Sequence, residues 1–226
     1  MGKSPRDRKR ARDRGEDGWK AREVVDLARE DEIGMVLSAF RESERRIPAR
    51  SVLAGEVRVP AEPGVYAWFF EPARLGIRGG YYEVLVGGEA LLYVGMVPSR
   101  SDSKKKLRDR MRNHLRNSAR QSTLRLSLGA LLIDKIPLEP VAYGDGRVDF
   151  GATEPVLTSW IAEHGHVSWM PHPSPWQIEG SLVRALGVPL NLYGNEGHPF
   201  FHILAAARAR VREKARNKNQ LFLQES

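Results

Sequence analysis

Hydrophobic and aromatic residues form short runs in the first half of the chain, and turn residues bound each run. Residues 63–70, PGVYAWFF, open with a Pro-Gly pair and continue as an apolar, aromatic segment, which is typical of a strand. Residues 81–86 and 91–97 have the same character. Because Gly87 and Gly88 separate the last two runs, we expect a tight turn between two strands there.

Elsewhere the apolar positions recur every three or four residues, as they do on one face of a helix. Helices are expected over residues 19–44, 105–120, 122–134, 154–164, 177–186 and 200–217. The first should break near the acidic run 30–32 and Gly34, and it should stop before Pro48. A hairpin is expected over residues 139–150 and a short strand over 166–170.

A basic excess is concentrated in two segments of the chain. The 226 residues include 36 Lys and Arg against 28 Asp and Glu, so the formal net charge is +8. Residues 104–125 hold nine basic residues against Asp109 alone, and residues 208–218 hold six against Glu213. This balance favours polyanionic partners, with nucleic acid ahead of an anionic membrane surface. Residues 1–18 carry both signs of charge and few apolar side chains, which predicts a disordered basic arm.

Several classes of protein are excluded by what the sequence lacks. There is no Cys, which excludes a disulfide scaffold, a thiolate nucleophile and a Cys-based metal site. No run approaches the roughly 18 apolar residues of a membrane span, and no apolar stretch follows the basic start as in a secretory signal. P-loop, dinucleotide and Gly-x-Ser-x-Gly motifs are absent as well. We therefore expect a cytoplasmic protein with no membrane partner.

Residues 107–120, LRDRMRNHLRNSAR, carry the most informative helical pattern. At about 100° per residue, Leu107, Met111 and Leu115 fall within an arc of about 80° that we expect to be buried. Arginines spaced four apart occupy the far side, and these are Arg108, Arg112, Arg116 and Arg120. Like charges at this spacing repel one another, which favours an anion lying against them. The alternative is an ordinary solvated basic face.

A second set of polar residues is notable for its position. Arg110 and His114 lie one turn apart at the margin of the buried stripe, where a charge is held in a fixed orientation. Tyr66 and Tyr93 lie on separate predicted strands, and both phenols can reach one face if those strands pair. Two further polar residues frame a later helix, Glu179 and Asn191. Each type also has an ordinary role, as strand packing for Tyr, dipole stabilisation for Glu and turn formation for Asn.

The order of these segments is more specific than any one of them. The run PGVYAWFF … LLYVG … LRDRMRNHL … IEGSLVRALGVPLN, within residues 62–192, resembles the GIY-YIG nuclease superfamily. Gly64-Val65-Tyr66 is similar to the first name-giving motif and Tyr93-Val94-Gly95 to the second. The family's later Arg, Tyr or His, Glu and Asn are matched by Arg110, His114, Glu179 and Asn191.

The chain also departs from the family pattern. Both motifs have Val where the family name has Ile, and an inserted hairpin separates them. Met96 occupies a position where several members carry Lys. A contact made by that Lys is therefore absent or is supplied by the loop Lys104–Lys106.

The resemblance implies an α+β fold in which a small antiparallel β-sheet is flanked by helices, and this chain adds helices at both termini. It also implies four parts. These are a disordered basic arm over 1–18, an N-terminal helical extension over 19–59, a nuclease domain over 60–195 and a C-terminal basic amphipathic helix over 196–226.

The implied function is a divalent-metal-dependent endonuclease that hydrolyses phosphodiester bonds in DNA. One Mg²⁺ or Mn²⁺ ion, held mainly by Glu179, would stabilise the leaving oxygen, and Arg110 would clamp the scissile phosphate. Tyr66 or Tyr93 would orient or deprotonate the attacking water, and His114 would assist or replace it. Asn191 would fix the end of the helix that Glu179 begins.

The expected partner is nucleic acid, in particular double-stranded DNA, bound through its phosphates. The residues expected to bind it are Lys104, Lys105, Lys106, Arg108, Arg112, Arg116 and Arg120. Two other classes of protein stay open. One is a noncatalytic nucleic-acid-binding module that keeps the fold, and the other is an adaptor that binds proteins through its terminal helices.

Overall fold

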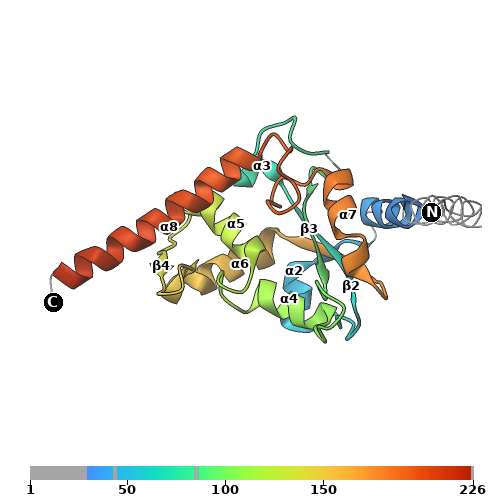
Figure 1. Cartoon of the computed structure of the whole chain (residues 1–226), viewed down its shortest axis with the longest axis horizontal. Helices are drawn as coiled ribbons and strands as arrows, with labels where there is room; N and C mark the ends of the chain where they lie inside the picture. The colour runs from blue at the N-terminus through green and yellow to red at the C-terminus, as the bar shows by residue number, and fades with distance from the viewer. Residues whose placement is uncertain (1–29, 43–44, 84, 86, 225–226) are drawn as a thin grey trace, which may run out of the picture. The chain divides into compact units, whose positions relative to one another are not determined.

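The computed structural model describes residues 30–224, apart from positions 43, 44, 84 and 86 (Figure 1). The arm predicted over 1–18 lies outside these residues. Residues 30–41 form one helix, so the predicted break near Gly34 is wrong. Glu is a good helix former and one Gly costs a helix only about 1 kcal/mol relative to Ala, so this segment tolerates a continuous helix.

A four-stranded antiparallel sheet organises the chain from Phe40 onward. Its strands lie in the order β1 (Ile47–Pro48), β6 (His166–Pro171), β2 (Gly64–Phe70) and β3 (Ala90–Val97). The predicted strands over 63–70, 91–97 and 166–170 are therefore confirmed. β1 falls in the segment 19–59 that we assigned to an extension, and the four-part division itself stays a prediction.

The predicted strand over 81–86 is wrong for the residues of that segment that the structure describes, which lie in bends and coil. One side of β3 pairs with β2, and its other side is covered by Leu190, whose backbone N donates to Leu92 O at 2.9 Å. At Leu92 this side of β3 is therefore already occupied. The tight turn is confirmed, since Leu85 N donates to Glu89 O at 2.8 Å and Gly87 and Gly88 both have positive φ.

Helices flank the sheet, and most lie where the sequence predicts them. They are α2 (Ala49–Ala54), α3 (Pro72–Leu75), α4 (Leu107–Leu115), α5 (Thr123–Leu132), α6 (Glu154–His164), α7 (Glu179–Leu186) and α8 (Phe201–Gln224). The hairpin predicted over 139–150 is confirmed as β4 (Val141–Ala142) and β5 (Val148–Asp149). Short 3-10 turns occupy Gly151–Thr153 and Pro175–Gln177.

α4 is shorter than the helix predicted over 105–120. It ends at Leu115 because Arg116 leaves helical geometry, with φ −125° and ψ −18°. The chain then turns, and Ala119 N donates to the carboxylate of Glu154 at 2.7 Å rather than to a carbonyl one turn earlier. The predicted ladder of four arginines on one helix face is therefore wrong, since Arg120 lies beyond the helix.

The sheet is buried, and α4 covers one of its faces. All seven residues of β2 are buried. Leu107, Met111 and Leu115 form the buried stripe of α4, as predicted, and join the main core. α7 contacts β3, and Figure 1 shows α8 running past α5 toward the C-terminus. The fold class is confirmed as α+β, and no helix among the described residues is long and apolar enough to cross a membrane.

Candidate active site

The two glycines of the strand motifs are explained by the close packing around Tyr66. In the register of β2 and β3, Tyr66 lies opposite Gly95. A Cβ atom at Gly95 would collide with the hydroxyl end of the Tyr66 ring. A Cβ atom at Gly64 would collide with the carbonyl of Met170 and the side chain of Leu107. Only Gly at both positions lets the ring lie flat on β3 and lets α4 approach β2.

The hydroxyl of Tyr66 is held between two residues of α4. Arg110 Nε donates to it at 2.9 Å, and His114 Nε2 shares a hydrogen bond with it at 3.0 Å. Tyr66 and His114 are both fully buried. Arg110 and His114 lie four positions apart on α4. The spacing that places both at the margin of the buried stripe therefore also brings both to the hydroxyl of Tyr66.

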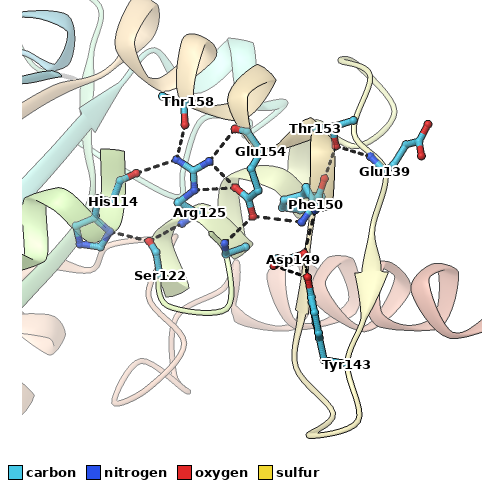
Figure 2. A network of polar contacts seen from close by, with 12 residues as sticks. His114, Ser122, Arg125, Glu139, Tyr143, Asp149, Phe150, Thr153, Glu154 and Thr158 are labelled. Carbon is cyan, nitrogen blue, oxygen red and sulfur yellow. Dashed lines mark hydrogen bonds and ion pairs between the residues drawn. The ribbon is translucent and has the colours of Figure 1, made fainter. Parts of the chain in front are cut away.

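His114 is fixed from its other side by the first turn of α5. Its Nδ1 shares a hydrogen bond of 2.7 Å with Ser122 Oγ, which caps α5 by accepting from Arg125 N at 3.1 Å. Figure 2 shows the buried Arg125 guanidinium donating to the carbonyl of His114, to Thr158 Oγ1 and to the Glu154 carboxylate. The ring of His114 is thus held from both sides, by Tyr66 of β2 at Nε2 and by the N-cap of α5 at Nδ1, while Arg125 fixes its backbone carbonyl.

Burial sets the protonation of the pair. Burial raises the pKa of the Tyr66 phenol above its ordinary value, and the nearby Arg110 guanidinium only partly offsets this. Burial also lowers the pKa of His114 well below its ordinary value, and the positive charges of Arg110 and Arg125 lower it further. Both groups are therefore neutral near pH 7, a protonated phenol beside an unprotonated imidazole.

Tyr93 lies beside this pair on the same face of the sheet. Its ring centroid is 6.4 Å from that of Tyr66, and its hydroxyl shares a 3.0 Å hydrogen bond with Thr123 Oγ1 at the start of α5. The expectation that both phenols reach one face of the paired strands is confirmed.

A cavity of about 430 Å³ opens next to the two tyrosines. Tyr66, Tyr93 and Thr123 line it, and its charged lining residues are Arg100, Lys105, Arg110 and Arg208. No Asp or Glu is among the described residues that line it. Four cations and several hydroxyl groups around one cavity fit an anionic ligand such as a phosphodiester.

Asn191 binds the second motif strand directly. Its side-chain Oδ1 accepts from Val94 N at 3.0 Å, and its Nδ2 donates to Val94 O at 2.8 Å. Both bonds go to β3, not to the end of α7 as predicted. Because Val94 lies between Tyr93 and Gly95, Asn191 fixes the strand segment that carries one phenol and makes room for the other.

Glu179 is the first residue of α7. The placement of its side chain is not among the described features, so its role as a metal ligand stays a prediction. Val183, one turn later on the same face of α7, lines the cavity. Among the described residues, no group of three or more His, Cys, Asp or Glu could hold a metal ion. A single carboxylate suits a Mg²⁺ ion whose coordination shell is completed by water and substrate oxygens.

The basic residues predicted to bind nucleic acid are divided among several places. Lys105 lines the cavity, Lys104 is exposed, and Lys106 precedes α4 as its N-cap residue. Arg108, Arg112 and Arg116 line a separate hollow of about 360 Å³.

Arg120 lies apart from both. Its Nη2 donates to the carboxylate of Asp145 at 2.9 Å, and its guanidinium lies over the ring of Tyr143. The structure therefore brings together Tyr66, Tyr93, Arg110, His114 and Lys105, but it does not gather the predicted arginine ladder.

Sequence reasoning missed three residues of this cluster, Ser122, Thr123 and Arg208. Ser122 was recognisable only as an N-cap type, and nothing in the sequence indicates that its hydroxyl meets His114. Arg208 had a clearer signal, because it lies at helical spacing from the apolar Leu204 and Val211. A charged residue within a buried stripe is more informative than a charged residue in a basic run.

The comparisons with known proteins agree with this geometry. The sequence model of a family described as the GIY-YIG catalytic domain matches residues 64–210, more than half of the chain. The matched segment includes both strand motifs, α4, α7 and the first turns of α8. No curated protein and no solved structure matches the chain.

Proposed function

The chain belongs to the GIY-YIG family, a nuclease family, and we propose on that premise that it is a divalent-metal-dependent endonuclease that hydrolyses phosphodiester bonds in DNA. The observation that carries the proposal is the Tyr66 hydroxyl, bonded to Arg110 and His114 at the wall of a cavity whose described charges are all positive. A purely structural tyrosine would not need a buried imidazole and a guanidinium on one oxygen atom.

The cavity suits the charge of the substrate. A phosphodiester is an anion, and its hydrolysis builds further negative charge on the nonbridging and leaving oxygens. Arg110 and Lys105 line the cavity and can stabilise that charge. Arg110 Nε is bonded to Tyr66 and its Nη1 to Gln121 O at 3.2 Å, and its remaining N–H groups would donate to the phosphate.

The hydrogen bonds around His114 provide a route for a proton. Ser122 Oγ accepts from Arg125 N, and it can also accept from a proton on His114 Nδ1. Nε2 is then free to accept the phenolic proton of Tyr66, while the phenol oxygen takes the proton of the attacking water. Because burial and the nearby Arg110 and Arg125 lower the pKa of His114, its imidazole is neutral at neutral pH, and Nε2 has a lone pair that can accept the hydrogen bond of the phenol. Tyr93 orients the water from the adjacent wall.

Glu179 is the residue that would hold the metal ion in this proposal. Bound Mg²⁺ or Mn²⁺ would supply Lewis-acid stabilisation of the charge that develops on the leaving oxygen. Only one carboxylate is needed when water and phosphate oxygens complete the coordination shell. Asn191 contributes indirectly by holding β3 in place.

The preferred partner in this proposal is double-stranded DNA in the cytoplasm, bound through its phosphates. The noncatalytic module is the alternative to separate first, since it predicts binding without cleavage. The bonds on the Tyr66 hydroxyl argue against it, because phosphate binding alone does not require a proton acceptor behind a phenol.

Nicking of supercoiled plasmid tests the proposal. The full chain is incubated with supercoiled, linear and single-stranded DNA in Mg²⁺, Mn²⁺ or EDTA. We expect nicking that requires the metal, that is lost in Tyr66→Phe and that persists in Tyr82→Phe, a control tyrosine outside the cavity lining. Metal-independent binding with no cleavage of any substrate would favour the noncatalytic module.

A further inference from the structure

Arg208 is the cation of the cavity for which the catalytic proposal has no role. It lies on α8 and is only 7% exposed. Its neighbours along the helix, Leu204, Val211 and Ala215, are buried in the main core. Burying a guanidinium group is far more costly than burying an apolar side chain, so an arginine at this position calls for a specific reason.

The contacts of Arg208 with the protein orient its guanidinium. Nη2 donates to the carbonyl of Thr123 at 3.0 Å and to the hydroxyl of Ser127. Neither acceptor depends on it. The Ser127 hydroxyl itself donates to Leu190 O, and the Thr123 carbonyl begins α5, where it accepts from the N–H four residues later. With an apolar residue at position 208, the Ser127 hydroxyl and the Thr123 carbonyl would therefore each keep a hydrogen bond.

The Nε atom of Arg208 is a further reason to expect a ligand. It is buried and has no hydrogen-bond partner within the described part of the chain. Leaving a charged donor unpaired in the interior is unfavourable, and native proteins rarely do so without a functional reason. Arg208 also lines the cavity that holds Tyr66 and Arg110, so an anion bound there lies within reach of its guanidinium.

Arg110 divides its donors between the protein and the cavity. Its Nε is committed to Tyr66 and its Nη1 to Gln121. Arg208 comes from a different element, and burial lowers its pKa to about 10, which still leaves it charged at neutral pH. Arg208 also lies within the segment that matches the family, which extends to residue 210.

We propose that Arg208 is a second phosphate-binding arginine of this site. Its guanidinium binds a nonbridging oxygen of the DNA backbone, while Arg110 stays bonded to Tyr66. The first turns of α8 are then part of the substrate site, not only a cover for α5. This inference rests on the proposed function in one respect, that the anion is a phosphodiester.

The test compares Arg208→Met with Arg210→Gln in the full chain. Arg210 lies on the same helix and pairs at the surface with Asp134 at 3.1 Å, so its variant controls for the loss of one positive charge. A short fluorescent DNA duplex is titrated in EDTA, so that no cleavage occurs, over a range of salt concentrations. Thermal unfolding is measured on the same samples.

We expect Arg208→Met to weaken binding about tenfold or more beyond Arg210→Gln, as fits the loss of a hydrogen bond to a charged group. The log–log salt slope should fall by about 0.9, one phosphate contact. The melting temperature should stay the same or rise, because a buried charge is replaced by a packed apolar chain. Binding equal to that of Arg210→Gln would overturn the proposal, whatever the melting temperature.

Arg208→Lys covers the case in which Arg208→Met does not fold. Lysine keeps the charge, but its three donors diverge from one nitrogen, so they cannot span Thr123, Ser127 and the cavity as the separate nitrogens of a guanidinium do. Weaker binding than in the unmodified chain supports the proposal, and unchanged binding overturns it. The catalytic proposal is tested separately. It fails if the unmodified chain binds DNA in EDTA but does not nick DNA when the metal ion is present.

Discussion

Arginines lie on both sides of α4, but they differ in burial and in the groups that they bind. On one side, Arg110 is half-buried and its Nε is fixed on the Tyr66 hydroxyl. On the other, Arg112 is exposed, and Arg108 reaches a backbone carbonyl, that of Val59, at 3.4 Å. The first side carries an arginine fixed on a phenol, whereas the arginines of the second side bond only to backbone carbonyls or lie exposed.

This difference separates two functions of a basic helix. An arginine held rigidly against a phenol can set the position and protonation of a reacting group. Exposed arginines around a hollow, with Arg58 as a further lining residue, add affinity that depends on salt. We therefore expect substitutions on the cavity side to change the rate of cleavage, and substitutions on the other side to change binding.

The largest effect should come from Glu179→Gln, at the first residue of α7. The substitution keeps the size of the side chain and removes the charge that would hold the metal ion. Cleavage should fall at least about a thousandfold, while DNA affinity in EDTA should persist or increase. Glu163→Gln on the surface of α6 is the control. If Glu179 only stabilises the helix start, turnover stays normal and the cost is about 0.3–1 kcal/mol of stability.

The next largest effect should distinguish the two phenols. Tyr66→Phe removes the oxygen atom that Arg110 and His114 share, so cleavage should fall about a hundredfold or more. Tyr93→Phe loses only a hydrogen bond to Thr123, and its rate should fall less. Single-turnover rates with saturating DNA measure both. Equal, near-normal rates in both variants would transfer the role of base to His114.

On the other side of α4, the double variant Arg112→Gln/Arg116→Gln should weaken DNA binding without slowing cleavage at saturating DNA. Each phosphate contact that is lost should reduce the log–log salt slope by about 0.9. A salt titration of affinity measures this slope. An unchanged slope would mean that DNA does not contact this side, and a slower saturated rate would break the division between the two sides.

The smallest effect concerns the pH dependence of stability. Burial lowers the pKa of His114 in the folded chain. As the pH falls through about 6.5, the imidazole therefore takes up a proton in the unfolded chain but stays neutral in the folded chain. Stability should therefore decrease as pH falls below about 6.5, by up to about 1.4 kcal/mol per pH unit for this group. In His114→Gln this component should vanish. Denaturant unfolding at several pH values measures it, and parallel curves for the two proteins would contradict the buried neutral state.

Much of the cavity side could be predicted from the order of the motifs. Tyr66, Arg110 and His114 were placed together because two strand motifs and a helix with a four-residue spacing occur in a fixed sequence. The spacing alone left ordinary roles open for each of them, and the resemblance to the GIY-YIG family joined them into one site.

The rest depended on tertiary contacts that no local pattern contains. α4 ends early because the Glu154 carboxylate, far along the chain, takes the N–H of Ala119. The segment 81–86 is not a strand because Leu190 already covers β3. Arg208 reaches the cavity only because α8 packs on α5.

The cover on β3 has a consequence for how the protein behaves among copies of itself. A bare edge strand presents a row of open N–H and C=O groups on which another chain can add a strand. Here Leu190 and the amide of Asn191 occupy that row at Leu92 and Val94, and the opposite edge, β1, is only two residues long. Asn191 therefore protects the sheet from aggregation as well as supporting Tyr93, and its loss would carry two penalties at once.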